Sequence, residues 1–208
     1  MKKRILLIVT CVVCMISFSG CAWFSSKKNQ LKGSLIGVSY TAEFYDNYGA
    51  LFTTVTGENI DIDGNFVEEQ GIASDGTSTT NYSLSSVVTI TIDGKQMESC
   101  GNTIIFSESG LKKDVDFSLE DIKSTSDGSV TSLTSVAKLV NKFKNDFGKP
   151  TVVVIQSQLG VPICAYSGDE VRWEVPDDLP KMTKLMIDGK ALYIHRANFE
   201  IIDRDLLG

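Results

Sequence analysis

After residue 32 the chain consists mainly of short apolar, β-branched and aromatic runs, which Gly, Asn and Asp residues separate. Ile60-Asp61-Ile62-Asp63 alternates apolar and acidic positions, the period of a strand with one buried and one solvated face. Asp-Gly pairs at 63–64, 93–94 and 188–189 follow such runs and favour tight antiparallel turns. About ten short strands are therefore predicted, the clearest at 35–45, 51–56, 82–92, 103–106, 151–156 and 171–175.

Two segments depart from this alternating pattern. Residues 68–81 are polar and are expected to form a long loop or the tip of a hairpin. Residues 152–155 are apolar without interruption, which suits a strand that is covered on both faces.

One amphipathic helix is predicted at about 133–147. Its apolar face recurs at helical spacing and consists of Leu133, Val136, Val140, Phe143 and Phe147. Ser132 is a suitable N-cap, and Gly148 with Pro150 is a typical stop signal. The expected fold class is thus α+β, mostly antiparallel β in a sandwich-like arrangement, with the helix on one flank.

The N-terminus has the layout of a bacterial lipoprotein signal peptide. Lys2, Lys3 and Arg4 precede an apolar stretch of 14 residues, 5–18, and Ser19-Gly20-Cys21 follows it. The stretch is shorter than the roughly 20 residues that span a bilayer. We therefore expect cleavage before Cys21 and lipidation of its thiol. An uncleaved anchor and an ordinary secretory signal, in which Cys21 is incidental, remain as alternatives. Phe18 departs from the lipoprotein pattern, which usually has Leu three positions before the cysteine.

This organisation predicts three parts: a signal peptide at 1–20, a polar tether at 21–32 and a single β-rich extracytoplasmic domain at 33–208. Lipid on Cys21 would hold the protein at the cell membrane, facing away from the cytoplasm. The membrane is thus the first expected partner.

Charge and cysteine content narrow the function classes. Without Lys2, Lys3 and Arg4 the chain has 17 basic residues against 26 acidic ones, a net charge of about −9. This balance disfavours nucleic acid as a partner, because phosphate binding requires basic patches. Outside the signal peptide and Cys21, the remaining cysteines are Cys100 and Cys164, either one disulfide or two buried free thiols.

The strongest candidate for chemistry is a group of acids around an aromatic residue. Asp169, Glu170 and Glu174 surround Trp173 in the sequence. Many sugar-binding sites combine acids with an aromatic ring, and paired carboxylates hydrolyse glycosides. The alternative is a set of solvated loop acids near a buried Trp, so these four residues are weak ligand candidates.

Other catalytic and metal-binding patterns are incomplete. His195 is the single histidine, lies in a strand-like run and is expected to be half exposed. No Gly-x-Ser-x-Gly motif accompanies it, and one His cannot build a His-rich zinc site. Asp61, Asp63 and Asn65 begin like a calcium loop, but Ile72 stands at the twelfth position, where Glu is required. No catalytic residue, metal or cofactor is therefore predicted.

Several stretches resemble a known family. They are residues 33–37 running to 45–49, residues 153–163 and residues 185–198. These segments resemble a family of predicted bacterial lipoproteins of Gram-positive, Firmicutes-type organisms, whose domain has no assigned function. The resemblance covers nearly the whole mature chain. It implies a lipoprotein of a Gram-positive surface and transfers no active-site residue.

The expected function is that of a membrane-anchored surface lipoprotein that acts as a non-enzymatic binding or interaction module, with an envelope protein or glycan as partner. The alternative is a cell-envelope hydrolase that acts on glycan or peptide through the carboxylates near Trp173. A solute-capturing transporter subunit ranks last, because the chain is short and lacks a repeated βα pattern.

Overall fold

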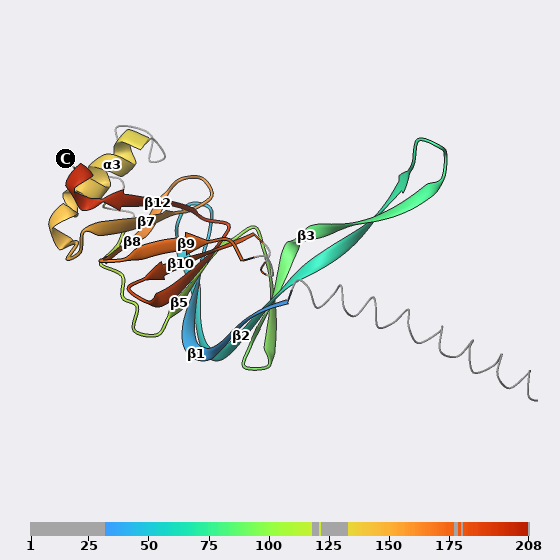
Figure 1. Ribbon diagram of the computed structural model, residues 1–208, viewed down its shortest axis with the longest axis horizontal. Helices are drawn as coiled ribbons and strands as arrows, with labels where there is room; N and C mark the ends of the chain where they lie inside the picture. The colour runs from blue at the N-terminus through green and yellow to red at the C-terminus, as the bar shows by residue number, and fades with distance from the viewer. Residues whose placement is uncertain (1–31, 118–120, 122–132, 177–178, 180, 208) are drawn as a thin grey trace, which may run out of the picture.

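The computed structural model describes residues 32–117, 121, 133–176, 179 and 181–207 (Figure 1). Over these residues it is mostly antiparallel β-sheet with one short α-helix, as the sequence predicted. The predicted signal peptide, Cys21, the tether up to residue 31 and Ser132 lie outside the described residues. None of the described helices is long and apolar enough to cross a membrane.

Twelve strands of the described residues form two sheets. In spatial order, the larger sheet contains β4 (Lys95–Cys100), β3 (Ser78–Ile92), β2 (Leu51–Ile72), β1 (Lys32–Tyr45), β5 (Thr103–Glu108), β11 (Lys190–His195), β10 (Met182–Ile187) and β9 (Val171–Glu174). The smaller sheet contains β12 (Asn198–Asp203), β7 (Thr151–Gln156), β8 (Pro162–Gly168) and β6 (Val115–Asp116). Every pairing is antiparallel.

The apolar run at 152–155 is buried on both faces, as predicted. Val152 and Val154 pack in a cluster with Leu139 and Val140 of helix α3 (Leu133–Lys142). Val153 and Ile155 pack in a second cluster, which joins the two sheets. Because neighbouring side chains of a strand point to opposite faces, β7 connects these two cores.

The larger sheet also has a core on each face. Ile105 of β5 belongs to the cluster between the sheets, whereas Ile104 and Phe106 belong to a third cluster on the opposite face. That third cluster includes Phe44 of β1 and Ile60 of β2, both fully buried. The central strands are therefore covered on both faces. Exposed side chains that could bind a partner lie at the sheet edges and on the β2–β3 hairpin.

The region after β1 differs most from the prediction. Residues 51–72 form one continuous strand of 22 residues, β2, instead of two short strands and a loop. Asp63-Gly64 lies inside β2, so no turn forms there, whereas Asp93-Gly94 and Asp188-Gly189 are turns as predicted. Residues 73–77 alone form the bend to β3, which makes the polar segment a hairpin tip.

The helix is shorter than predicted and ends at Lys142, followed by the 3₁₀ turn η1 (Lys144–Asp146). Phe147 is buried and Phe143 is partly buried against the same core as α3. The apolar face predicted for one helix is thus retained, although the α-helix α3 is followed by the 3₁₀ turn η1.

Candidate functional site

The candidate aromatic residue is exposed, which corrects the alternative interpretation of a buried Trp among solvated loop acids. Trp173 lies on β9, an edge strand of the larger sheet, and 63% of its surface is accessible. Its register partner on β10 is Leu185, which is fully buried in the cluster between the sheets. Trp173 thus lies on the same face of the larger sheet as Leu185. In the described residues, no further strand pairs with the outer edge of β9.

Each candidate carboxylate near Trp173 has a cationic neighbour. Glu174 accepts from Lys184 at 2.6 Å, and Glu170 lies 3.3 Å from Arg172 Nε. Asp169 pairs with Lys149, which also lies 3.2 Å from Asp188. The structure therefore places the four predicted residues together around β9, with the acids engaged in ion pairs.

Asp188, which the sequence analysis did not select as a site residue, organises this end of the sheet. Its Oδ1 accepts the backbone N–H groups of Asp169 at 2.8 Å and Glu170 at 2.9 Å, and its own N–H donates to the Glu170 carbonyl at 2.9 Å. The Glu170 N–H and the Lys149 ammonium hold the pKa of Asp188 below its ordinary value. These contacts lock two hairpin turns together, which is a structural role.

A partly buried polar cluster lies between the sheets and had no signal in the sequence. Lys113 Nζ lies 2.7 Å from Glu43 Oε2 and donates to Asp116 at 2.8 Å and to the Tyr45 hydroxyl at 3.1 Å. The side chains of Lys113 and Glu43 are 16% and 15% exposed. Burial disfavours the ammonium, but the hydrogen bonds to Asp116 and Glu43 outweigh it and raise the pKa of Lys113. The amine is thus held protonated, unsuited to act as a nucleophile.

Cys100 and Cys164 are free thiols in the structure. Cys100 is exposed on β4, and Cys164 is completely buried on β8. Burial raises the pKa of Cys164, so its thiol stays protonated and behaves as a small apolar core residue. Next to it, the Tyr166 and Ser107 hydroxyls lie 3.1 Å apart and satisfy each other.

The histidine is a core residue, not the half-exposed strand residue expected. His195 is 2% exposed on β11, between Ile104 of β5 and Met182 of β10 in the register of the sheet. In the part of the chain that the structure describes, no group of three or more His, Cys, Asp or Glu side chains is arranged to hold a metal ion.

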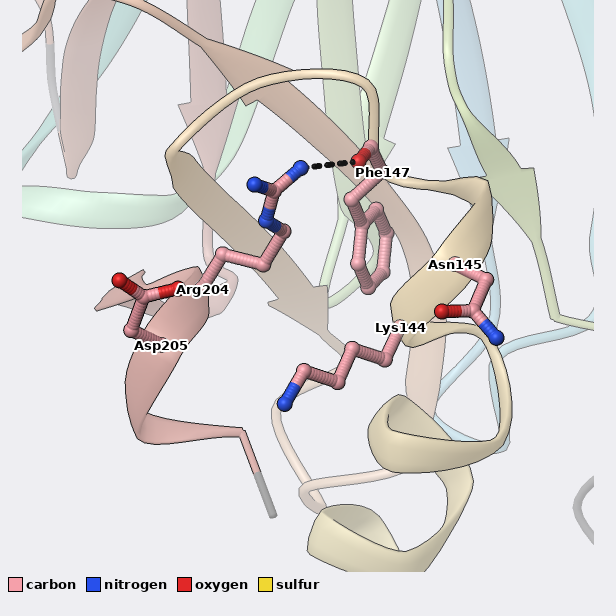
Figure 2. A pocket seen from close by; sticks show the side chains of 5 residues that line it. All are labelled: Lys144, Asn145, Phe147, Arg204 and Asp205. Atoms are coloured by element: carbon pink, nitrogen blue, oxygen red, sulfur yellow. Dashed lines mark hydrogen bonds between the residues drawn. The ribbon is translucent and has the colours of Figure 1, made fainter.

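A small polar hollow lies near the C-terminus. It is lined by Lys144, Asn145 and Phe147 from the η1 segment and by Arg204 and Asp205 of the turn η2 (Arg204–Leu206) (Figure 2). Arg204 donates to the Phe147 carbonyl at 3.0 Å, and Lys144 donates to the Leu207 carbonyl. The two cations thus tie the C-terminal turn to the helix region.

Ile72, the most exposed large apolar residue of the larger sheet, lies on the β2–β3 hairpin, which extends away from the two sheets (Figure 1). We call residues 66–84 the β2–β3 arm. A register shift separates it from the body: Asn65 alone lies opposite residues 85–87 of β3. Such a bulge bends a strand and increases its twist, which accounts for the new direction of the ribbon.

The arm exposes large apolar side chains on a ribbon only two strands wide. The accessible fractions are 41% for Phe66, 46% for Val67, 82% for Ile72 and 39% for Leu84. Phe66 and Leu84 are register partners and share one face. These side chains on a projecting hairpin are available for contact with a partner, so the arm is the strongest candidate for a functional surface.

Sequence comparison assigns the chain to a family. A family model described as Domain of unknown function (DUF5052) matches residues 3–207. The chain belongs to the DUF5052 family. No curated protein and no solved structure matches the chain at a significant level.

Membership in DUF5052 agrees with the resemblance to a family whose domain has no assigned function. The DUF5052 match covers both the described sheets and most of the predicted signal peptide. Its description assigns no residue roles.

Proposed function

We propose that this DUF5052 protein is a surface lipoprotein that acts as a non-enzymatic interaction module, with the β2–β3 arm as its docking element. The two sheets and α3 serve as a sandwich-like scaffold. The arm is held out from that scaffold so that its strands and apolar side chains reach a protein partner.

The observation that carries the proposal is the construction of the arm. It extends the ladder of β2 and β3 by seven residue pairs beyond the bulge, from Phe66↔Leu84 to Ile72↔Ser78. At about 3.3 Å per residue, this places the tip roughly 20 Å from the body. A protein that needed this hairpin only for its own core would bury Phe66 and Leu84.

Lipidation of Cys21 fits the position of the arm. β1 begins at Lys32, whose register partner is Asp63, two residues before Asn65 in the bulge. The tether would therefore join the domain at the base of the arm. Eleven residues from Cys21 to Lys32 reach at most roughly 35–40 Å, so the arm would work close to the membrane of a Gram-positive-type cell.

The hydrolase alternative has less support. Cleavage of a glycoside requires two carboxylic groups that act on one bond, one as acid and the other as base or nucleophile. Asp169, Glu170 and Glu174 instead lie in three separate ion pairs. Trp173 is exposed on an edge strand and has an apolar register partner.

The test is site-specific photo-crosslinking in cells that express the full chain. A photoreactive amino acid is placed at Thr80 in the arm, and at Lys112 on the body as a matched exposed control. A discrete crosslinked protein from position 80, absent from position 112, is the expected result. Position 80 yielding no more product than position 112 would contradict a docking role of the arm.

A Cys21→Ser variant tests the anchor separately. Lipidated protein should remain with the membrane fraction, and the variant should be released into the medium or left unprocessed. Unchanged anchoring and processing of the variant would overturn the lipoprotein assignment without affecting the arm.

A further inference from the structure

The arm presents two open strand edges. Among the described residues, β1 pairs with β2 only as far as Asp63, and β4 pairs with β3 only from Val87 onward. Residues 66–72 and 78–84 therefore pair with each other and with no other described strand. A two-stranded ribbon is at best marginally stable in water, and a third strand stabilises it.

The two edges differ in charge. The β2 edge carries Glu68 and Glu69, and Glu69 accepts a hydrogen bond from Ser83 across the ribbon at 2.7 Å. The β3 edge, residues 78–84, contains no charged residue and no proline. Proteins protect exposed edges with charges, prolines and bulges. Inside the arm, the β3 edge lacks all three, which marks it as the edge built for strand addition.

The distribution of charge also indicates which partner can pair with the β3 edge. The sequence has no Lys or Arg between residues 33 and 94 but contains nine acidic residues there. An anionic membrane surface would repel such a segment. A second β3 edge would not, because it is itself uncharged and the acids of both copies remain on the outer β2 strands.

We propose that a second copy of this chain adds its β3 edge to the β3 edge of the first, in antiparallel orientation. The result is a four-stranded sheet in the order β2, β3, partner β3, partner β2. This inference rests on the proposed docking role of the arm and names its occupant. The contact is isologous, since the same edge of each copy meets itself around a two-fold axis.

The symmetry sets the arrangement of side chains. A two-fold axis perpendicular to the sheet places the same face of both arms on the same side. Phe66 and Leu84 of each copy, which share one face of the ribbon, therefore lie on the same face of the four-stranded sheet. Pairing thus supplies backbone partners for the open edge of β3 and places Phe66, Ile72 and Leu84 of both copies on one face, whereas Val67 lies on the opposite face.

A pair of matched double variants tests the edge. Thr80→Lys/Leu84→Lys adds two charges to the β3 edge. Gln70→Lys/Phe66→Lys adds the same charges to the β2 edge at the register partners of those positions. The two double variants therefore place their charges at the same height along the arm and on the same face of the ribbon. The four substituted residues are exposed. Circular dichroism of each purified full chain shows whether the fold is retained.

The measurement is the molar mass of the full chain in mild detergent, by sedimentation or light scattering over a concentration series. We expect the wild type at twice the chain mass. The β3 variant should dimerise about tenfold more weakly or not at all, and the β2 variant should dimerise like the wild type. Loss of dimers in both variants would show that the face carrying Phe66 and Leu84, not the β3 edge, makes the contact, and would overturn the proposal.

A wild type that stays monomeric at every concentration would also overturn it. In that case the photo-crosslinking experiment separates the two ideas. A product of position 80 that contains a different protein leaves the docking role intact and rejects the second copy, whereas the absence of any arm-specific product rejects both.

Discussion

Lys113 and Glu43 lie 70 positions apart in the sequence, and their side chains meet at 2.7 Å between the two sheets. Both Glu43 oxygens lie within hydrogen-bond distance of the ammonium, at 2.7 and 2.8 Å. Asp116 and the Tyr45 hydroxyl also accept from it. Because an ammonium has three donors, every hydrogen of Lys113 has an acceptor, which is the condition for placing a cation in a mostly buried site.

Replacing Lys113 by Met should destabilise the fold. Glu43 is only 15% exposed, so removal of its cation leaves a mostly buried carboxylate without a counter-ion. Breaking such a pair from one side costs about 3 kcal/mol or more, measurable as a lower urea midpoint. Lys112→Met is the control, because Lys112 is an exposed neighbour and its loss should change the midpoint little. Equal effects of the two variants would contradict a structural role for the Lys113 ion pair.

The two cysteines should differ in reactivity. The exposed Cys100 should be alkylated in the native protein, whereas Cys164 should react only after unfolding, because it is completely buried and its pKa is raised. Alkylation mapped residue by residue by mass spectrometry, with and without urea, provides the measurement. Protection of both thiols in urea, relieved by a reductant, would instead demonstrate a disulfide between them.

The acids around Trp173 should be dispensable for the fold and for the surface role. The triple variant Asp169→Asn/Glu170→Gln/Glu174→Gln removes three exposed ion pairs, and such pairs contribute little to stability. We expect a nearly unchanged urea midpoint and unchanged arm-specific crosslinking in cells. A well-folded variant that loses the cellular phenotype of the protein would favour the hydrolase alternative.

Local sequence predicted those parts of the fold that local geometry decides. Asp93-Gly94 and Asp188-Gly189 form turns in which all four residues have positive φ, the conformation that this dipeptide favours. Asp63-Gly64 is the same dipeptide, yet Asp63 pairs with Lys32 on one side and Thr89 on the other. Pairing with two neighbouring strands overrides the turn preference there, and this depends on residues far away in the chain.

The candidate sites also separate into features that neighbouring residues determine and features that distant residues determine. The grouping around Trp173 was visible because its members are neighbours in sequence, but their salt bridges with Lys149 and Lys184 depend on other strands. Lys113 and Glu43 meet only because β1 and the segment before β6 flank the space between the sheets. The arm was predicted only in part. The polar composition of residues 68–81 indicated a loop or hairpin tip, but not the long pairing of β2 with β3 that carries it.

Asp188 should contribute a pH-dependent part of the stability. Its folded-state pKa lies below the ordinary value of 3.8, because backbone N–H groups and Lys149 favour the carboxylate. This contribution is therefore complete above about pH 4 and is lost as the pH falls through the folded-state pKa. The difference in unfolding free energy between the wild type and Asp188→Asn should shrink between about pH 6 and about pH 3. A difference that stays constant or grows on acidification would contradict this role of the carboxylate.

Gly57 permits the close contact between β2 and the end of β3, and Gly57→Ala should be destabilising. A Cβ at this position would lie 2.4 Å from Cγ2 of Ile92, which is 7% exposed, and 3.0 Å from Oδ2 of Asp93. The Asp93 carboxylate is fixed by the N–H groups of Glu58 and Asn59, so it cannot move away without losing them. Overpacking of this kind costs about 1–3 kcal/mol, measured by urea unfolding.

A double-mutant cycle distinguishes this clash from a general effect of adding a methyl group. Ile92→Ala removes the Cγ2 atom that the new Cβ would meet, so Gly57→Ala should cost less in the Ile92→Ala background than in the wild type. Gly148→Ala is the control, because nothing lies within 4 Å of a Cβ built there. Strict additivity of Gly57→Ala and Ile92→Ala would place the cost in the backbone of β2. Coupling between them would locate it in the contact that holds β2 against β3 below the arm.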